Sequence, residues 1–192
     1  PAVDLWPAEN WLDVVGWQDG GAILSLGEMD YSFSLAVRQF QRRRDKLVAT
    51  SHLTATSPME KEWHPQDDGD RAGFRRVTLP PMDGALDANL EALAKLGAEV
   101  MHGVDATDIK HTMRWRAMAS AFQYAVFPFP RASLRRENDP RNSELVRGFF
   151  RSALPGGGIV KPAGTLQLVL LSSQYEDWDL AGLAAEAGLA PG

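Results

Sequence analysis

The sequence contains no cysteine, so disulfide bonds, thiolate metal sites and a cysteine nucleophile are all excluded. No apolar run approaches the roughly 20 residues of a membrane span, and the first residues lack the basic and then apolar order of a signal peptide. We therefore expect the chain as given to be soluble. Its compartment stays open, because an absence of thiols is compatible with any redox environment.

The sequence also has fewer basic residues than acidic ones, 20 against 25. The 192 residues carry a formal net charge of -5, which argues against indiscriminate nucleic-acid binding by the whole surface but leaves room for a local basic face. With 44% hydrophobic residues, a chain of this length can bury the core of one domain. We expect an N-terminal extension over residues 1–21 and one domain over residues 22–192, with an inserted polar excursion at about 56–82.

Apolar runs alternate with helical periodicity along the expected domain. Strands are predicted at Ala22–Leu26, Lys46–Ser51, Glu99–His102, Phe122–Phe127 and Thr165–Leu171, with one further short strand at Phe74–Leu79. Helices are predicted at Tyr31–Arg44, Asp87–Leu96, Thr112–Met118, Asn142–Leu154 and Trp178–Ala187. Five such alternations predict an α/β fold with a doubly wound, mostly parallel sheet of the Rossmann-like type, whose faces are covered by helices.

Ligands of such sheets bind beyond the carboxyl ends of the strands, where four loops of this chain should meet. The first loop begins with Gly27, because a strand that turns sharply into a helix needs a residue without a side chain. The helix after it would offer unpaired N–H groups and the positive end of its dipole to a carboxylate or phosphate. A glycine after a strand is equally typical of a plain turn, so this feature alone leaves the ligand open.

Several segments together resemble one family. They are LGEMDYSFSLA, VATS, ANLEALAKLGAEVMHGVDATDI, FPFPRAS, NSELVRGFFRSA and WDLAGLAAEAGL, and their order and spacing are similar to those of the Rossmann-like domain of large-subunit rRNA uridine-N3 methyltransferases. The resemblance covers roughly residues 22–190, apart from the excursion. It implies a class I methyltransferase fold, S-adenosylmethionine as cofactor, and ribosomal RNA or a pre-ribosomal particle, with protein partners in a ribonucleoprotein. It also implies a nucleolar or cytoplasmic location. The final antiparallel strand pair of that fold has no counterpart in the pattern.

The resemblance also implies which residues bind the cofactor. They belong to the first loop, the end of the second strand and the segment after the third strand: Gly27, Glu28, Asp30, Ser32, Thr50, Ser51, Asp105 and Ala106. A carboxylate of the first loop would accept hydrogen bonds from the ammonium group of the cofactor, and Asp105 would meet the adenine amino group. For Asp105 a helix N-cap is an equally weighted alternative, and one residue can serve both roles.

The segment after the fourth strand would face the target base, where an aromatic ring can stack on a flipped pyrimidine. The candidates for base contact are Phe127, Phe129, Pro130 and Arg131. A rigid proline-rich loop packed on the core is the alternative. No residue is an evident catalytic base, and His102 is more typical of strand-end packing. His64, with the aspartates at 67, 68 and 70, is more typical of a solvated loop than of a metal site, so no metal is expected.

The chain departs from the family pattern mainly at chemical positions. Met29 stands where a second glycine is usual, and Leu53 stands where the family has an aspartate suited to the ribose hydroxyls. The sequence from Pro128 to Arg131 replaces the usual Asn-Phe-Pro-His. A catalytically inactive scaffold within a ribonucleoprotein or ribosome-assembly complex is therefore the alternative to an RNA methyltransferase.

Basic residues form two clusters in the sequence. The first comprises Arg38, Arg42, Arg43, Arg44 and Lys46, and the second comprises Arg131, Arg135, Arg136, Arg141, Arg147 and Arg151. The second begins where an RNA backbone would have to pass, so Arg131, Arg135 and Arg136 are predicted to bind RNA. Solvated helix faces are the alternative for both clusters.

Overall fold

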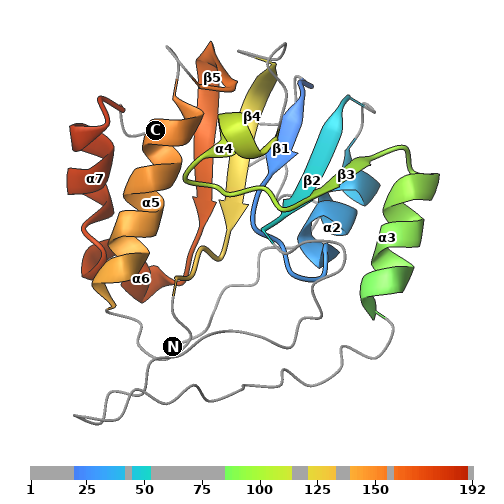
Figure 1. The fold of residues 1–192 in the computed structure, drawn as a ribbon, viewed down its shortest axis with the longest axis horizontal. Helices are drawn as coiled ribbons and strands as arrows, with labels where there is room; N and C mark the ends of the chain where they lie inside the picture. Colours follow the sequence, from blue (N-terminus) through green and yellow to red (C-terminus); the bar gives the residue numbers. More distant parts are fainter. Residues whose placement is uncertain are drawn as a thin grey trace, which may run out of the picture.

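The computed structural model describes residues 20–41, 45–52, 85–113, 121–132, 139–154 and 158–189. They contain one five-stranded sheet in which every strand is parallel to its neighbours, in the order β3-β2-β1-β4-β5 (Figure 1). The strands are β1 (Ile23–Ser25), β2 (Leu47–Ser51), β3 (Glu99–His102), β4 (Phe122–Pro128) and β5 (Val160–Val169).

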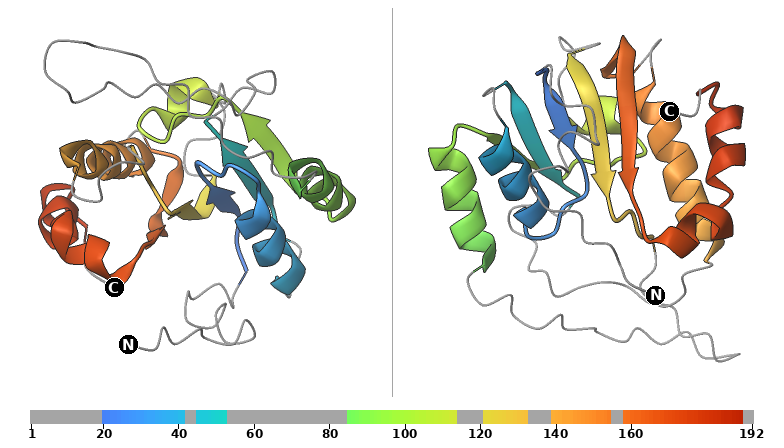
Figure 2. Two further views of the ribbon diagram at one scale, coloured as in Figure 1. Left: turned by 90° about the horizontal axis from the view of Figure 1, so that it is seen from below. Right: turned by 180° about the vertical axis from the view of Figure 1, so that it is seen from behind.

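Helices cover both faces of this sheet. They are α2 (Ser32–Phe40), α3 (Ala85–Lys95), α4 (Ile109–Thr112), α5 (Pro140–Ala153), α6 (Ser172–Asp177) and α7 (Leu180–Glu186). Helices α2 and α3 pack on one face, and α4, α5 and α7 pack on the other, so the described residues form three layers (Figure 2). The chain therefore has the α/β, Rossmann-like fold that the alternation of strands and helices predicts.

The central strands supply both cores at once, because successive residues of a strand point to opposite faces of the sheet. Leu24 of β1 and Val48 of β2 belong to the core beneath α5, whereas Ile23 and Leu47 belong to the core beneath α2. Every residue of β1 and β2 is buried. Burial on both faces explains why these strands are mostly continuous apolar runs and not alternating ones.

Several predicted helices differ from the observed ones. The helix predicted to run to Arg44 ends at Phe40, because Gln41 has an extended backbone. The helix predicted at Thr112–Met118 remains a prediction, because residues 114–120 lie outside the described part; the single turn α4, which ends at Thr112, precedes it and was not predicted. The helix predicted over Trp178–Ala187 is observed as α7, whereas α6, which precedes it and is separated from it by a break, was not predicted. Asp179 lies at this break with φ 49°, a left-handed conformation that interrupts a right-handed helix.

The last strand is longer than predicted. It begins at Val160 and not at Thr165, although Pro162 and Gly164 are unfavourable in a strand interior. Both residues are tolerated because β5 pairs with β4 alone and its register shifts next to Phe122. The predicted strand at 74–79, the excursion at 56–82 and the domain boundary at residue 22 remain predictions, since residues 1–19 and 53–84 lie outside the described part.

Parallel strands place all their carboxyl ends on one side of the sheet, at the bottom in Figure 1; we call this side the carboxyl edge. The central strand is β1, as predicted, and the chain winds outward from it in opposite directions through β2 and β4. The junction of β1 and β4 is thus the topological switch point, where doubly wound folds bind their ligands. Within the described residues, no helix combines the length and the apolar character that a membrane crossing requires.

Candidate functional site at the carboxyl edge

Gly27 follows β1 at the switch point and has φ 71°, a left-handed conformation that favours glycine. A Cβ atom at this position would lie 2.4 Å from Cε2 of Phe127 on the neighbouring strand β4. The Phe127 side chain is 5% exposed, and its ring packs edge-on against Phe149 of α5 with 5.4 Å between the ring centroids. Phe127 is therefore a core residue that covers Gly27, which contradicts its prediction as a base-stacking ring.

The Glu28 carboxylate points into the protein. Its Oε1 accepts hydrogen bonds from the hydroxyls of Ser25 and Ser34, and its Oε2 accepts one from the Ser34 N–H at 2.9 Å. Burial raises the pKa of Glu28, and these hydrogen bonds only partly oppose the rise. Glu28 thus caps the start of α2 from within the chain. The prediction that it binds the ammonium group of a cofactor does not fit this arrangement.

Asp30 caps the first residue of the same helix. Its Oδ1 accepts from the N–H of Ser32 at 3.0 Å and from the Ser32 hydroxyl at 2.8 Å, and its carbonyl accepts from Asn89 of α3 at 2.8 Å. The N–H groups of Ser32 and Ser34 in the first turn of α2 are therefore both satisfied by side chains of the preceding loop. The prediction that this helix start offers unpaired N–H groups to a ligand is wrong at these two positions.

Tyr31 joins the loop after β1 to the end of β3. Its backbone is left-handed, with φ 59°, and its side chain is buried. The hydroxyl lies 2.9 Å from Nδ1 of His102 and 3.4 Å from the carbonyl oxygen of Met101, and burial raises its pKa to about 12. His102 ends β3 and is exposed, but its ring packs edge-on against Tyr31 with 5.8 Å between the ring centroids, which agrees with its prediction as a strand-end packing residue.

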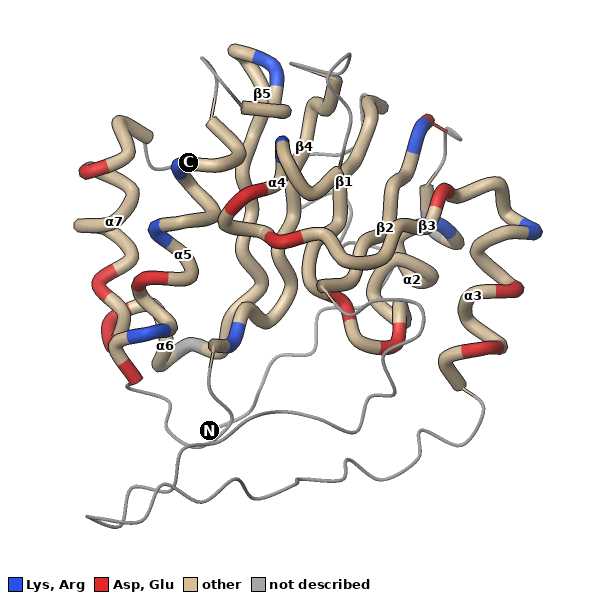
Figure 3. The backbone as a smooth tube through the Cα atoms, viewed as in Figure 1, with Lys and Arg blue, Asp and Glu red and all other residues tan. Residues whose placement is uncertain are grey.

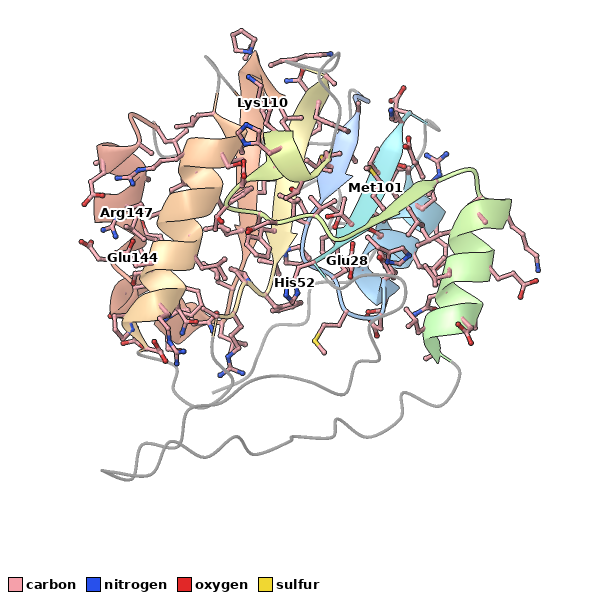
Figure 4. All side chains as sticks on the ribbon, in the orientation of Figure 1. Glu28, His52, Met101, Lys110, Glu144 and Arg147 are labelled. Atoms are coloured by element: carbon pink, nitrogen blue, oxygen red, sulfur yellow. The ribbon has the colours of Figure 1, made fainter. Side chains whose placement is uncertain are left out.

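Backbone hydrogen bonds tie the loops after β1, β2 and β3 together. The N–H of Glu28 donates to the carbonyl of Thr50, and the N–H of Val104 donates to the carbonyl of Ser51, both at 3.0 Å. Figure 4 shows Glu28 and His52, the residue after Ser51, at the carboxyl edge. The Thr50 hydroxyl is buried and has no hydrogen-bond partner among the described residues. A buried polar atom without a partner is rare in proteins and fits a position that meets a ligand or a water.

Asp105 follows β3 and is exposed at the same edge. Its Oδ1 accepts from the N–H and the hydroxyl of Thr107, both at 2.8 Å. Asp105 thus has the capping role that the sequence indicated as an alternative, here for the turn before α4. These hydrogen bonds fix its carboxylate without burying it. Ala106 beside it is 6% exposed and packs in the core.

The loop after β4 exposes an aromatic ring. Phe129 is 59% exposed and has φ 50°, although it lies between Pro128 and Pro130. A left-handed backbone costs about 1–2 kcal/mol for a residue other than glycine, and a following proline normally restricts the residue before it to extended conformations. The Phe129 N–H donates to the Val169 carbonyl of β5 at 2.9 Å. Pro130 is buried and Arg131 is exposed, while the predicted RNA-binding residues Arg135 and Arg136 lie outside the described part.

Several of the other basic residues hold the fold. Arg38 is 7% exposed and donates to the carbonyls of Leu96 and Asp45, so it belongs neither to a solvated face nor to an RNA-binding one. In the second cluster, Arg141 pairs with Asp139, and Arg147 pairs with Glu144 and Glu186 (Figure 4). These pairs lower the local positive charge that the sequence alone indicated.

Two exposed apolar residues beside this loop were absent from the prediction. Leu171, which precedes α6, is 51% exposed, and Tyr175 within α6 is 55% exposed. Their spacing of four residues, typical of one helix face, was the signal available in the sequence. No group of acidic and histidine side chains suited to a metal ion occurs in the described part of the chain, and His64 with its aspartates lies outside it.

An all-parallel, doubly wound sheet with a glycine turn at its switch point defines the Rossmann-like class of cofactor-binding folds. Residues 81–191, more than half of the chain, match the model of the BMT5-like family, described as rRNA (uridine-N3-)-methyltransferase. The chain belongs to this family. The resemblance of its sequence segments to uridine-N3 methyltransferases is thereby confirmed.

Two further comparisons gave matches that are partial or of low similarity. The chain is 32% identical over 110 residues to heavy metal-associated isoprenylated plant protein 41 of Arabidopsis thaliana; the match covers 53% of this chain and 20% of that protein, so the chain spans about a fifth of its relative. A crystal structure of a protein assigned as an O-methyltransferase, from Klebsiella pneumoniae, is similar over 84% of this chain and 55% of its own, with 12% identity and a TM-score of 0.40.

Proposed function

We propose that the chain is an S-adenosylmethionine-dependent RNA methyltransferase that methylates N3 of a uridine in large-subunit ribosomal RNA. Membership of the BMT5-like family supports the reaction class and the RNA substrate. The arrangement of the carboxyl edge supports a site in which a cofactor and a base lie side by side.

The observation that carries the proposal is the contact between the loops after β1 and β4. The Phe127 ring lies directly on Gly27, and Phe129, two residues further along, projects into solvent. A ligand held by the first loop and a base stacked on Phe129 would therefore be neighbours across the switch point. Methyl transfer requires this proximity, because holding two reactants at near-attack distance supplies much of the rate enhancement.

The residues present fit the cofactor at three positions. The left-handed turn at Gly27 leads the chain from β1 into the first loop at the switch point, the buried Thr50 hydroxyl lacks a partner among the described residues, and the Asp105 carboxylate is fixed and exposed. When bound, S-adenosylmethionine supplies an electrophilic methyl group. Asp105 can accept a hydrogen bond from an adenine amino group. Glu28 and Asp30 would not contact the cofactor; they hold the first loop and the start of α2 in place.

The residues on the β4 side would orient the uridine. Phe129 offers a ring for stacking, and Arg131 offers a positive charge for a phosphate next to the target. N3 of uridine must lose its proton before it can attack a methyl group, and among the described residues near Phe129 none is an evident base. We therefore expect positioning to contribute more than acid–base catalysis.

Calorimetric titration with S-adenosylmethionine tests the cofactor part. The parent chain should bind, and Asp105→Ala should bind more weakly by about 1–3 kcal/mol, because the adenine amino group would lose a charged hydrogen-bond acceptor. Asp108→Ala is the matched control, because Asp108 is exposed three residues away and contacts His111. Met29→Gly should leave binding unchanged or tighter, since Met29 stands where the family has glycine. An absence of heat at millimolar cofactor would select the inactive scaffold instead.

Methylation of ribosomal RNA tests the reaction part. The product expected by mass spectrometry of nucleosides is 3-methyluridine, and Phe129→Ala should lower its formation without changing the heat of cofactor binding. Methylation at another atom or of another base would contradict the proposed specificity but not the methyltransferase class.

A further inference from the structure

The large apolar side chains that are exposed in the described residues all lie at the carboxyl edge. They are Met29 after β1, Phe129 after β4, Leu171 after β5 and Tyr175 in α6, with exposed fractions of 39%, 59%, 51% and 55%. We call these four side chains the apolar strip. Its restriction to one edge distinguishes it from the scattered exposed apolar residues that are normal on protein surfaces.

The strip is built on a rigid support. The Phe129 N–H is bonded to the Val169 carbonyl, and β5 leads from there to Leu171, the residue that caps α6. The Leu171 N–H donates to Oε1 of the buried Gln174 at 2.9 Å, which fixes the start of α6. Tyr175 follows Leu171 by four residues and so lies on the same side of the helix. The Phe129 and Tyr175 rings thus belong to adjoining elements, and Leu171 lies in the segment of chain that connects β5 to α6.

Charge along the strip changes sign from one end to the other. Arg131 follows Phe129 and is exposed, whereas Glu176 and Asp177 follow Tyr175 and are also exposed. Near them, Asp139 is paired with Arg141 at the start of α5. Figure 3 shows basic residues at the bottom of the molecule near the start of α5 and acidic residues around α6 and α7. A polyanion on the strip would therefore place its phosphates toward Arg131 and away from the two carboxylates.

We propose that the apolar strip binds an unpaired RNA strand next to the target nucleotide, with the target base on Phe129 and a neighbouring base stacked on Tyr175. This inference rests on the proposed function and adds a requirement for unpaired RNA. Base faces are available for stacking only where the bases are not in a duplex. Aromatic side chains beside a basic residue are the usual combination in proteins that bind single strands.

The test measures binding of a labelled RNA of about eight unpaired nucleotides, with one central uridine, by fluorescence anisotropy of the full chain without cofactor. Tyr175→Ala should weaken binding on the order of tenfold, because one stacked base is lost. Tyr175→Phe keeps the ring and should bind as the parent does. The same RNA annealed to its complement should bind more weakly, and Tyr175→Ala should then have no effect. Equal melting temperatures of the variants exclude unfolding as the cause.

A second variant probes the acidic end of the strip. Glu176→Gln combined with Asp177→Asn should tighten RNA binding at low salt, because two charges close to the strand are removed. Glu91→Gln combined with Glu99→Gln is the matched control, since it changes net charge equally on α3 and at the amino end of β3. A larger gain for the first pair than for the second supports the strip; equal gains would reflect net charge alone and contradict it.

The outcomes separate this inference from the proposed function. If the parent methylates uridine in RNA but Tyr175→Ala binds and methylates as the parent does, the strip is wrong and the proposed function stands. If the parent neither binds unpaired RNA at low salt nor methylates it, both are wrong. A third outcome is that the parent binds an Arg-rich peptide and the variant with Glu176→Gln and Asp177→Asn does not. The strip would then be a protein-docking surface, and the RNA inference would be overturned.

Discussion

The two halves of the carboxyl edge are built from different side chains. On the side of β1, β2 and β3, the loops are joined by hydrogen bonds: Glu28 and Asp30 hold α2, Tyr31 reaches His102, and Asp105 holds Thr107. On the side of β4 and β5, the prominent side chains are exposed and apolar: Phe129, Leu171 and Tyr175.

The difference corresponds to two kinds of ligand. A small polar cofactor requires a preorganised set of polar groups, and internal hydrogen bonds keep the loops of the first half in place before it binds. An RNA strand presents flat base faces and a flexible backbone, which exposed rings can meet in several arrangements. We therefore expect variants of the first half to change stability and cofactor affinity, and variants of the second half to change RNA affinity with little effect on stability.

Gly27 lies where the two halves touch, so its replacement should have the largest effect. Gly27→Ala combines left-handed strain with a clash against Phe127, and we expect the free energy of unfolding to fall by about 3 kcal/mol. Urea unfolding measures this loss. Gly188→Ala is the matched control, because Gly188 has the same φ of 71° and no atom within 4 Å of an added Cβ. It should lose only the strain, about 1 kcal/mol; equal losses would show that the Phe127 contact is unimportant.

Reversal of the basic residues after Phe129 should affect the second half alone. The triple variant of Arg131, Arg135 and Arg136 to Glu should flatten the salt dependence of RNA binding, since each phosphate contact on a single strand contributes a slope of roughly -0.7. We expect the slope to decrease in magnitude by about 2. RNA affinity at several salt concentrations is the measurement. If parent and variant bind equally, the basic residues are a solvated surface.

Glu28 tests the first half through its pH dependence. Because the pKa of Glu28 is raised in the folded state by burial, the unfolded chain releases this proton at a lower pH than the folded chain does. Stability should therefore fall as the pH rises from the ordinary carboxyl pKa through the raised one, and stay constant above it. Glu28→Gln should lack this fall in urea unfolding across the same pH range. Glu28→Ala should be less stable at every pH by about 1 kcal/mol, since it loses the cap of α2.

Tyr31→Phe should have the smallest effect. It keeps the buried ring and removes only the hydroxyl that contacts His102, so we expect a loss of about 1 kcal/mol or less in unfolding free energy. Because burial raises the pKa of Tyr31 to about 12, the phenolate absorbance that develops near this pH should be smaller in this variant than in the parent. RNA affinity should not change; a clear loss of RNA binding would break the division between the two halves.

The elements of the sheet could be predicted because their signals are local. Runs such as Ile23–Ser25 and Leu47–Ser51 are buried on both faces, and the helices between strands keep a regular apolar period. Helix α6 could not be predicted in this way, because its six residues span fewer than two turns and show no clear apolar period. Asp179, which has a left-handed backbone, separates α6 from α7, and its Oδ1 accepts from the Gly182 N–H at the start of α7.

The site was predicted less well than the fold, for a physical reason. The loops were found from glycine and acidic residues, but a sequence does not show whether a carboxylate points outward or inward. Glu28 points inward because Ser25 and Ser34, three residues before and six after it, supply donors that compensate for its burial. Phe127 and Phe129 are the same residue type and lie two positions apart, so the sequence does not distinguish them. Only the packing of Phe127 on Gly27 shows that Phe127 is the core ring and Phe129 the exposed one.

The backbone of Phe129 bears on how natural selection acts on this loop. A glycine at position 129 would adopt φ 50° without strain, so a chain selected for stability alone would be expected to carry glycine there. A phenylalanine that is strained, exposed and followed by proline lowers stability and contributes little packing in return. Proteins tolerate such local costs mainly where function depends on the side chain. In a laboratory evolution experiment, selection for thermal stability should therefore favour glycine at position 129, whereas selection for activity should retain phenylalanine.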